Sequence, residues 1–247
     1  AFALDFLRHV DIVRANYRAV FELVPDLPDA QAAGPELDFR GDDPEPAATV
    51  EALHTLGYHD AKRIVSGVRR WLAGHVRALR SSRARDLMTV MVPSILVTLG
   101  HQPNPDEAFV RFDRFISALP AGVQPMSLFH RNPRQLDRIA AVLGAAPLLS
   151  EHLVRYPSAL EGLLTTDEVV DVRRMLRSRL TDADRPEDVI QIVRQTVKER
   201  DFFLSVATLE GRLDANASGR QRTALAEAAL SVLVPRVLAD FATRFGR

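Results

Sequence analysis

The chain has 247 residues, enough for one large or two modest cores, and its apolar (47%) and charged (26%) fractions are typical of globular proteins. No run approaches the ~18 uncharged apolar residues of a membrane span, and residues 1–5 lack the features of a signal peptide. The chain has no cysteine, and 32 basic residues balance 32 acidic ones. This excludes a disulfide framework and a global field for nucleic acid or anionic lipid. These features favour a cytoplasmic protein that binds neither membrane nor nucleic acid.

The apolar spacing is helical almost throughout, and Val, Ile and Thr never form the alternating runs that indicate strands. The first helix is predicted over residues 2–23, before Pro25. Residues 25–46 contain five Pro and seven carboxylates with one Arg, which predicts an acidic linker. We therefore expect an all-α fold, an elongated bundle of about ten helices in two subdomains.

Two long helices are predicted after the linker. Asp60 is expected to cap the first, in which apolar residues including Trp71 recur at helical spacing as far as Leu79. The second is expected over residues 82–99, with a bend at Pro93, because proline removes a backbone donor. Trp71 is predicted to lie in the core.

Proline and polar caps mark the starts of the later helices. Asn104 followed by Pro105 begins a helix that ends at Pro120 and Gly122 and whose phenylalanines are expected in the core. A short unit beginning at Asn132 is echoed 24 residues later at Tyr156. Further helices are predicted to begin at the box Thr165-x-x-Glu168, at Arg185 followed by Pro186, and at Ser218-x-x-Gln221, the last with a kink at Pro235. The phenylalanines expected in the core are Phe109, Phe112, Phe115 and Phe129.

Several motifs occur in a recognisable order. Residues 109–128 read FVRFDRFISALPAGVQPMSL, residues 143–153 read LGAAPLLSEHL, and Ser218-Gly219-Arg220 precedes Leu225-Ala226-Glu227-Ala228. Their order and spacing resemble the segment between the two nucleotidyltransferase domains of the bifunctional glutamine synthetase adenylyltransferase/adenylyl-removing enzymes. Departures from that family's pattern occur at Pro125-Met126, at Thr223-Ala224 and in the stretch that begins at Phe202.

The resemblance implies an organisation in four parts. Residues 1–24 would trail the preceding nucleotidyltransferase domain, and residues 25–46 would be the linker. Residues 47–99 would form a helical subdomain, and residues 100–247 a central, regulatory subdomain that leads into the second nucleotidyltransferase domain. The glycine-rich turn and paired carboxylates that hold Mg²⁺ and ATP in such domains are missing from this sequence. We therefore expect no catalytic, cofactor-binding or metal residues here, and assign ATP and Mg²⁺ to the parent enzyme.

The implied function is to position the two catalytic domains of an enzyme that attaches AMP to glutamine synthetase and removes it by phosphorolysis. The implied partners are glutamine synthetase, the nitrogen-regulatory PII protein and the flanking domains in cis, and the region would relay PII and glutamine signals. A free-standing helical scaffold that binds a protein partner is the alternative. A gene with its own start and stop codons would favour that alternative.

A basic run with no acidic residue extends from Ala61 to Arg85. On a continuous helix its arginines would form a stripe beside the apolar face. The stripe could be a solvated face that pairs with the acidic linker, a contact for a protein partner, or a nucleic-acid site. Nucleic acid is least favoured, since no aromatic residues are interleaved for stacking. The candidate partner-contact patch consists of Arg69, Arg70, Arg77, Arg80 and Arg83.

Three weaker signals favour structural roles. Asp182-Ala183-Asp184 has the spacing of a metal pair but lacks the preceding Gly-Ser turn, so helix capping is favoured. His59 with Asp60 would need further converging ligands, and Gly211 and Gly219 have no preceding strand for a phosphate loop. An autonomous metal-dependent hydrolase would need Asp182 or His59 to bind Mg²⁺ or Zn²⁺.

Overall fold

The computed structural model describes residues 37–246 apart from 42, 44, 166–170, 182 and 184. In that part of the chain there are eleven α-helices, one short 3₁₀ helix and no strand, which confirms the all-α prediction. The expected helix over residues 2–23, most of the acidic linker and residues 166–168 of the Thr165-x-x-Glu168 box lie outside the described residues, and Thr165 is the last residue of a helix. None of the described helices is long and apolar enough to cross a membrane.

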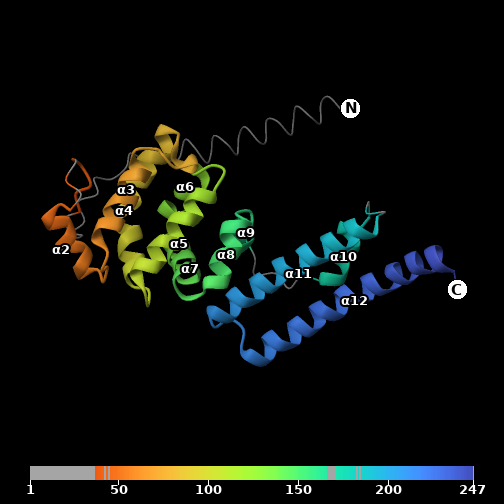
Figure 1. The fold of residues 1–247 in the computed structure, drawn as a ribbon. Coiled ribbons are helices and arrows are strands. Elements are labelled where there is room, and N and C mark those ends of the chain that lie inside the picture. Colours follow the sequence, from red (N-terminus) through yellow and green to blue (C-terminus); the bar gives the residue numbers. More distant parts are fainter. Residues whose placement is uncertain are drawn as a thin grey trace, which may run out of the picture. The chain divides into compact units, whose positions relative to one another are not determined.

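The first group of helices surrounds the larger of two hydrophobic cores (Figure 1). Trp71, Phe109, Phe112, Phe115 and Phe129 are all at most 2% exposed, which confirms their prediction as core residues. Trp71 stacks on Phe109 with ring centroids 5.0 Å apart, a geometry that adds to the stabilisation from burial. The helices of this group are α2 (Ala47–Thr55), α3 (Ala61–Leu72), η1 (Arg77–Leu79), α4 (Ser82–Gly100), α5 (Pro105–Ala118), α6 (Val123–Arg131), α7 (Pro133–Ala145), α8 (Pro147–Arg155) and α9 (Ala159–Thr165).

The second group consists of α10 (Val172–Arg179), α11 (Pro186–Leu209) and α12 (Ala215–Phe245). Figure 1 shows α11 and α12 running side by side, joined by a short turn at Gly211, whose φ of 70° suits glycine. Their smaller core contains Leu176, Leu180, Val189, Val193, Ala228 and Ala229.

Helix α11 belongs to both cores. Val189 and Val193, near its start, pack in the smaller core. Phe202 and Val206, nearer its end, are buried in the larger core against the preceding helices. One uninterrupted helix therefore supplies buried residues to both cores.

Helix boundaries confirm some sequence predictions and correct others. Asn104 caps α5, and Pro186 begins α11, as predicted. The helix capped by Asp60 is shorter than predicted, since α3 ends at Leu72 and Gly74, with φ of 74°, turns the chain before η1. The prediction failed because apolar spacing continues through the turn while glycine ends the helix.

The last helix also begins earlier than predicted. Helix α12 starts at Ala215, and the side chain of Asp214 accepts a hydrogen bond from the Ala217 amide, so the expected start at Ser218 is wrong. Aspartate is a strong cap, and the Ser218 hydroxyl instead lies 3.0 Å from the hydroxyl of Thr208. Helices α4 and α12 continue without a break through Pro93 and Pro235.

Candidate functional site

The predicted partner-contact patch separates into two sets of arginines. Arg69 donates to the Phe39 carbonyl at 3.1 Å, and Arg70 pairs with Asp113. Asp113 also accepts a 2.7 Å hydrogen bond from the indole of Trp71. Arg69 and Arg70 therefore hold neighbouring segments together.

The other three arginines of the patch are at least partly open to solvent. Arg77 and Arg80 are exposed and Arg83 is half-buried, and none of them forms an ion pair within the described residues. They lie on η1 and at the start of α4 rather than on α3, so the predicted single helical stripe is wrong. Arg85, by contrast, donates to the Arg80 carbonyl at 2.6 Å. The free basic surface is thus Arg77, Arg80 and Arg83.

Asp60 and His59, which were considered as metal ligands, have structural roles in the fold. Asp60 caps α3 by accepting a bond from the Arg63 amide, as predicted. Asp106 accepts bonds from the amides of His59 and Asp60 at 3.0 Å each. Burial raises the pKa of Asp106, but these hydrogen bonds outweigh burial and hold the pKa below its usual range. His59 lies 3.2 Å from Asp106 with a largely exposed side chain.

No three His, Asp or Glu side chains in the described part of the chain are arranged to hold a metal ion. Asp182 and Asp184 lie outside the described residues. The two glycines considered for a phosphate loop have structural roles. Gly211 makes the turn between α11 and α12, and Gly219 lies inside α12.

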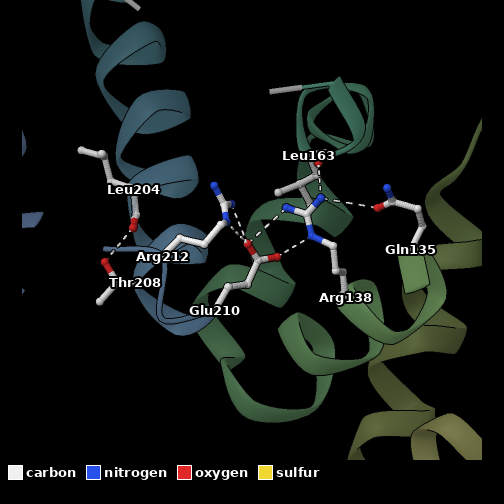
Figure 2. Close-up of polar contacts among 7 residues, drawn as sticks. All are labelled: Gln135, Arg138, Leu163, Leu204, Thr208, Glu210 and Arg212. Atoms are coloured by element: carbon white, nitrogen blue, oxygen red, sulfur yellow. Dashed lines mark hydrogen bonds and ion pairs between the residues drawn. The ribbon is translucent and has the colours of Figure 1, made fainter. Parts of the chain in front are cut away.

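An ion-pair cluster links the two helix groups, and the sequence alone gave no indication of it (Figure 2). Arg138, on α7, donates to both carboxylate oxygens of Glu210, at 2.5 and 3.2 Å. It also donates to the Leu163 carbonyl at 2.8 Å, on α9. Glu210 caps the end of α11, and its side chain also accepts a bond from Arg212 at 2.6 Å. We call this cluster the Arg138–Glu210 bridge.

The Arg138–Glu210 bridge is partly shielded from water. The side chains of Arg138 and Glu210 are 30% and 16% exposed, which is less than in most surface pairs. Burial raises the pKa of Glu210, but hydrogen bonds from Arg138 and Arg212 outweigh it and hold that pKa below its usual range. A two-oxygen pair of this kind fixes orientation as well as distance. The bridge therefore sets where the end of α11 lies on α7 and α9.

Further polar contacts hold α11 against α12. Arg222, on α12, donates to Asp201 and to Ser205 on α11, each at 2.7 Å, and to Ser218 at 2.8 Å. Thr208 donates to the Leu204 carbonyl at 2.8 Å within α11 (Figure 2). The α11–α12 pair is consequently joined as a unit to the larger core through the Arg138–Glu210 bridge.

Sequence reasoning missed the Arg138–Glu210 bridge because its partners lie 72 residues apart. Neither residue belongs to a charge run, and both occur at helical positions where arginine and glutamate are common. The only available signal was position, since Glu210 directly precedes the glycine that ends α11.

Comparisons with known proteins point to one family. Residues 136–247 match the family model for glutamate-ammonia ligase adenylyltransferase. The chain is 34% identical over its whole length to the bifunctional glutamine synthetase adenylyltransferase/adenylyl-removing enzyme of Mesorhizobium japonicum, of which it covers 25%. It is 32% identical, again over its whole length, to that of Brucella melitensis, also covering 25%. With that of Agrobacterium fabrum, it is 32% identical over 95% of the chain, covering 24% of that enzyme.

No solved structure matches the chain. The chain spans about a quarter of the length of the curated relatives that it matches. Together, the family model, the whole-length similarity and the motifs of residues 109–164 show that this chain belongs to the family of bifunctional glutamine synthetase adenylyltransferase/adenylyl-removing enzymes.

Proposed function

We propose that this chain is the helical connector of a cytoplasmic enzyme that adenylylates glutamine synthetase and removes the adenylyl group. It positions two nucleotidyltransferase domains in cis, and these domains carry ATP, Mg²⁺ and the chemistry. The observation that supports this most is the similarity of the whole chain to a quarter of each bifunctional relative. The activities for which those relatives are named provide the substrate in this proposal.

The connector acts through α11 and the Arg138–Glu210 bridge. Helix α11 contributes buried residues to both cores, so a domain attached to one core is mechanically coupled to the other. The bridge fixes the end of α11 against α7 and α9. In this proposal a signal from PII or glutamine changes the balance between the two activities by shifting this arrangement.

Binding and transfer measurements on the chain test the proposal. Titration calorimetry with glutamine synthetase and with PII, with and without uridylyl groups, measures the partner contacts. An assay with ATP, Mg²⁺ and glutamine synthetase measures AMP transfer. We expect binding without transfer. Transfer by the chain alone would contradict a purely connecting role, and absence of binding to both proteins would contradict the regulatory part.

The free basic surface is our candidate for the partner contact. Arg77, Arg80 and Arg83 have no ion-pair partner in the described residues, so carboxylates of glutamine synthetase or PII could pair with them. Changing all three to glutamate should weaken binding in the calorimeter. Arg194→Glu on α11 is the matched control, because that arginine is also exposed but lies on another helix. Equal affinities of the two variants would rule out this contact.

The free-standing scaffold is distinguished by the same titrations. A free-standing scaffold would bind neither glutamine synthetase nor PII, and its gene would have its own start and stop codons.

A further inference from the structure

A hollow of about 260 Å³ lies where α8 and its C-cap, α10 and α11 meet. Its wall includes His152 and Tyr156 on one side, Arg179 at the end of α10, and Lys198 on α11. A second hollow, of about 430 Å³, shares His152 and Lys198 with the first. The first hollow is slightly smaller than sites for drug-sized molecules, which are roughly 300–1,000 Å³. It therefore suits a small metabolite.

The aromatic wall of the hollow is held rigidly. The imidazole of His152 stacks on the ring of Phe202 with centroids 4.4 Å apart and planes 12° from parallel. Phe202 itself is buried in the larger core. Burial lowers the pKa of His152, so the ring is neutral at neutral pH and offers one N–H donor.

Polar side chains converge on the hollow without protein partners. Within the described residues, His152, Tyr156, Gln195 and Lys198 form no side-chain hydrogen bond and no ion pair. They supply an imidazole, a phenol, an amide and an ammonium group, all of which can donate to an acceptor. A set of unpaired donors around one space is what a bound oxyanion requires.

The charges around the hollow leave one cation uncompensated. Arg179 pairs with Glu199 at 2.8 Å and also donates to Thr196 at 3.0 Å. Asp201 pairs with Arg222 at 2.7 Å. Glu199 also lines the hollow, but its charge is offset by Arg179, and that of Asp201 is offset by Arg222. The Lys198 ammonium is therefore the positive charge at the hollow that has no ion-pair partner among the described residues.

We propose that this hollow binds a small oxyanion, the carboxylate or phosphate group of a metabolite, with Lys198 as the charged contact. Gln195 and Tyr156 donate further hydrogen bonds, and Arg179 closes the far side. The bound anion contacts α8 from the larger core and α10 from the smaller core, as well as the helix that joins them. Occupancy therefore stabilises one placement of α10 against α8.

Calorimetric titration of the 247-residue chain with inorganic phosphate and, separately, with succinate tests the proposal at constant ionic strength. We expect saturable binding of at least one of them in the millimolar range or tighter. Lys198→Ala should weaken that binding about tenfold or more, because a hydrogen bond to a charged group is lost. Tyr156→Phe, which keeps the ring, should weaken it by a smaller factor.

Arg194→Ala is the matched control, since it removes an exposed cation one turn earlier on α11 that does not line the hollow. It should bind like the wild-type chain, and circular dichroism should show the same helix content in all variants. Binding of phosphate alone or succinate alone identifies the anion class. No saturable binding of either, or equal affinity in Lys198→Ala and Arg194→Ala, overturns the proposal.

Amide hydrogen exchange provides a second readout. Addition of the anion that binds should slow exchange in both α8 and α10, because the ligand contacts both helices. Slower exchange in α11 alone would overturn the inferred contact between the cores.

Discussion

The two hydrophobic cores differ in the number and size of the side chains that they bury. This difference distinguishes a rigid larger core from the more adaptable helices α10–α12. In the larger core, Trp71 and the phenylalanines of α5 are almost completely buried, and Trp71 stacks on Phe109 while Phe112 contacts Phe115 edge-on. The smaller core has only six buried residues, two of them alanines. Exposed large apolar side chains gather on α12: Leu230, Val234, Val237, Leu238, Phe241 and Phe245. We infer that the larger core stabilises the fold, while α10–α12 can shift.

Removing a buried side chain should have the largest effect on the free energy of unfolding, and this effect should differ between the two cores. Phe112→Ala should lower the free energy of unfolding by about 3–5 kcal/mol, because it leaves a cavity in the larger core. Leu176→Ala, in the smaller core, should cost about 2 kcal/mol, the lower end for such changes, since a thin core collapses more easily. Urea denaturation followed by circular dichroism measures both. A greater loss for Leu176→Ala would reverse the comparison.

Glycine-to-alanine changes should sharpen the comparison further. A Cβ on Gly67, in α3, would come within 2.7 Å of the Phe109 ring, so Gly67→Ala should destabilise the chain by about 1–3 kcal/mol. Gly219, in α12, has nothing within 4 Å of the same position, so Gly219→Ala should stabilise it by about 0.5–1 kcal/mol. Thermal melts of the two variants check the opposite signs. Shifts of the same sign would contradict the inferred difference in packing.

A substitution in the Arg138–Glu210 bridge, which joins the two groups of helices, should have an intermediate effect on the free energy of unfolding, and this effect should depend on pH. Glu210→Gln keeps the size of the side chain but removes its charge, and should cost about 1–3 kcal/mol at neutral pH. In the folded chain the pKa of Glu210 is lowered, so the stability that its charge contributes is complete above the ordinary glutamate pKa. This contribution is lost as the pH falls through the lower folded pKa. The gap between wild type and variant should therefore narrow in acid.

Glu187→Gln is the control for that measurement. Glu187 lies 3.9 Å from Arg185, and both side chains are mostly exposed, so the change should have no measurable effect on stability. A constant gap between wild type and Glu210→Gln from neutral to acidic pH would show that the charge of Glu210 does not stabilise the junction.

Substitutions on the open face of α12 should have the smallest effect. Leu238 is 62% exposed, and Leu238→Ser should change the free energy of unfolding by less than about 0.5 kcal/mol. Urea denaturation checks it against wild type. A loss comparable to that of Leu176→Ala would mean that this face is covered.

The apolar periodicity of the sequence predicted well where helices form, but it predicted poorly how the helices pack against one another. The spacing of Trp71 and Phe112 was sufficient to place both in the core, because a helix buries one face whatever it packs against. The end of α3 was missed because Gly74 interrupts a pattern that otherwise continues. Asp214 was missed as a cap because Ser218 offered an equally good local signal. Local chemistry predicts helices but does not distinguish between neighbouring caps.

Local sequence patterns predicted even less about the candidate site. A basic run indicates charge but not pairing. Only the fold shows that Arg69 and Arg70 are engaged, while Arg77 and Arg80 have no ion-pair partner in the described part of the chain. The pairing of Arg138 with Glu210 depends on how α11 returns to α7, which no local pattern encodes.

The proposed connector role can be tested most directly in the full-length enzyme of which we propose this chain to be a part. Glu210→Gln and the control Glu187→Gln should be compared for AMP transfer to glutamine synthetase and for its removal, each with and without PII. The account predicts that Glu210→Gln retains transfer without PII, while the factor by which PII changes the two activities falls by about fivefold or more. An unchanged PII response in Glu210→Gln, with hydrogen exchange confirming that the end of α11 has loosened, would contradict the account.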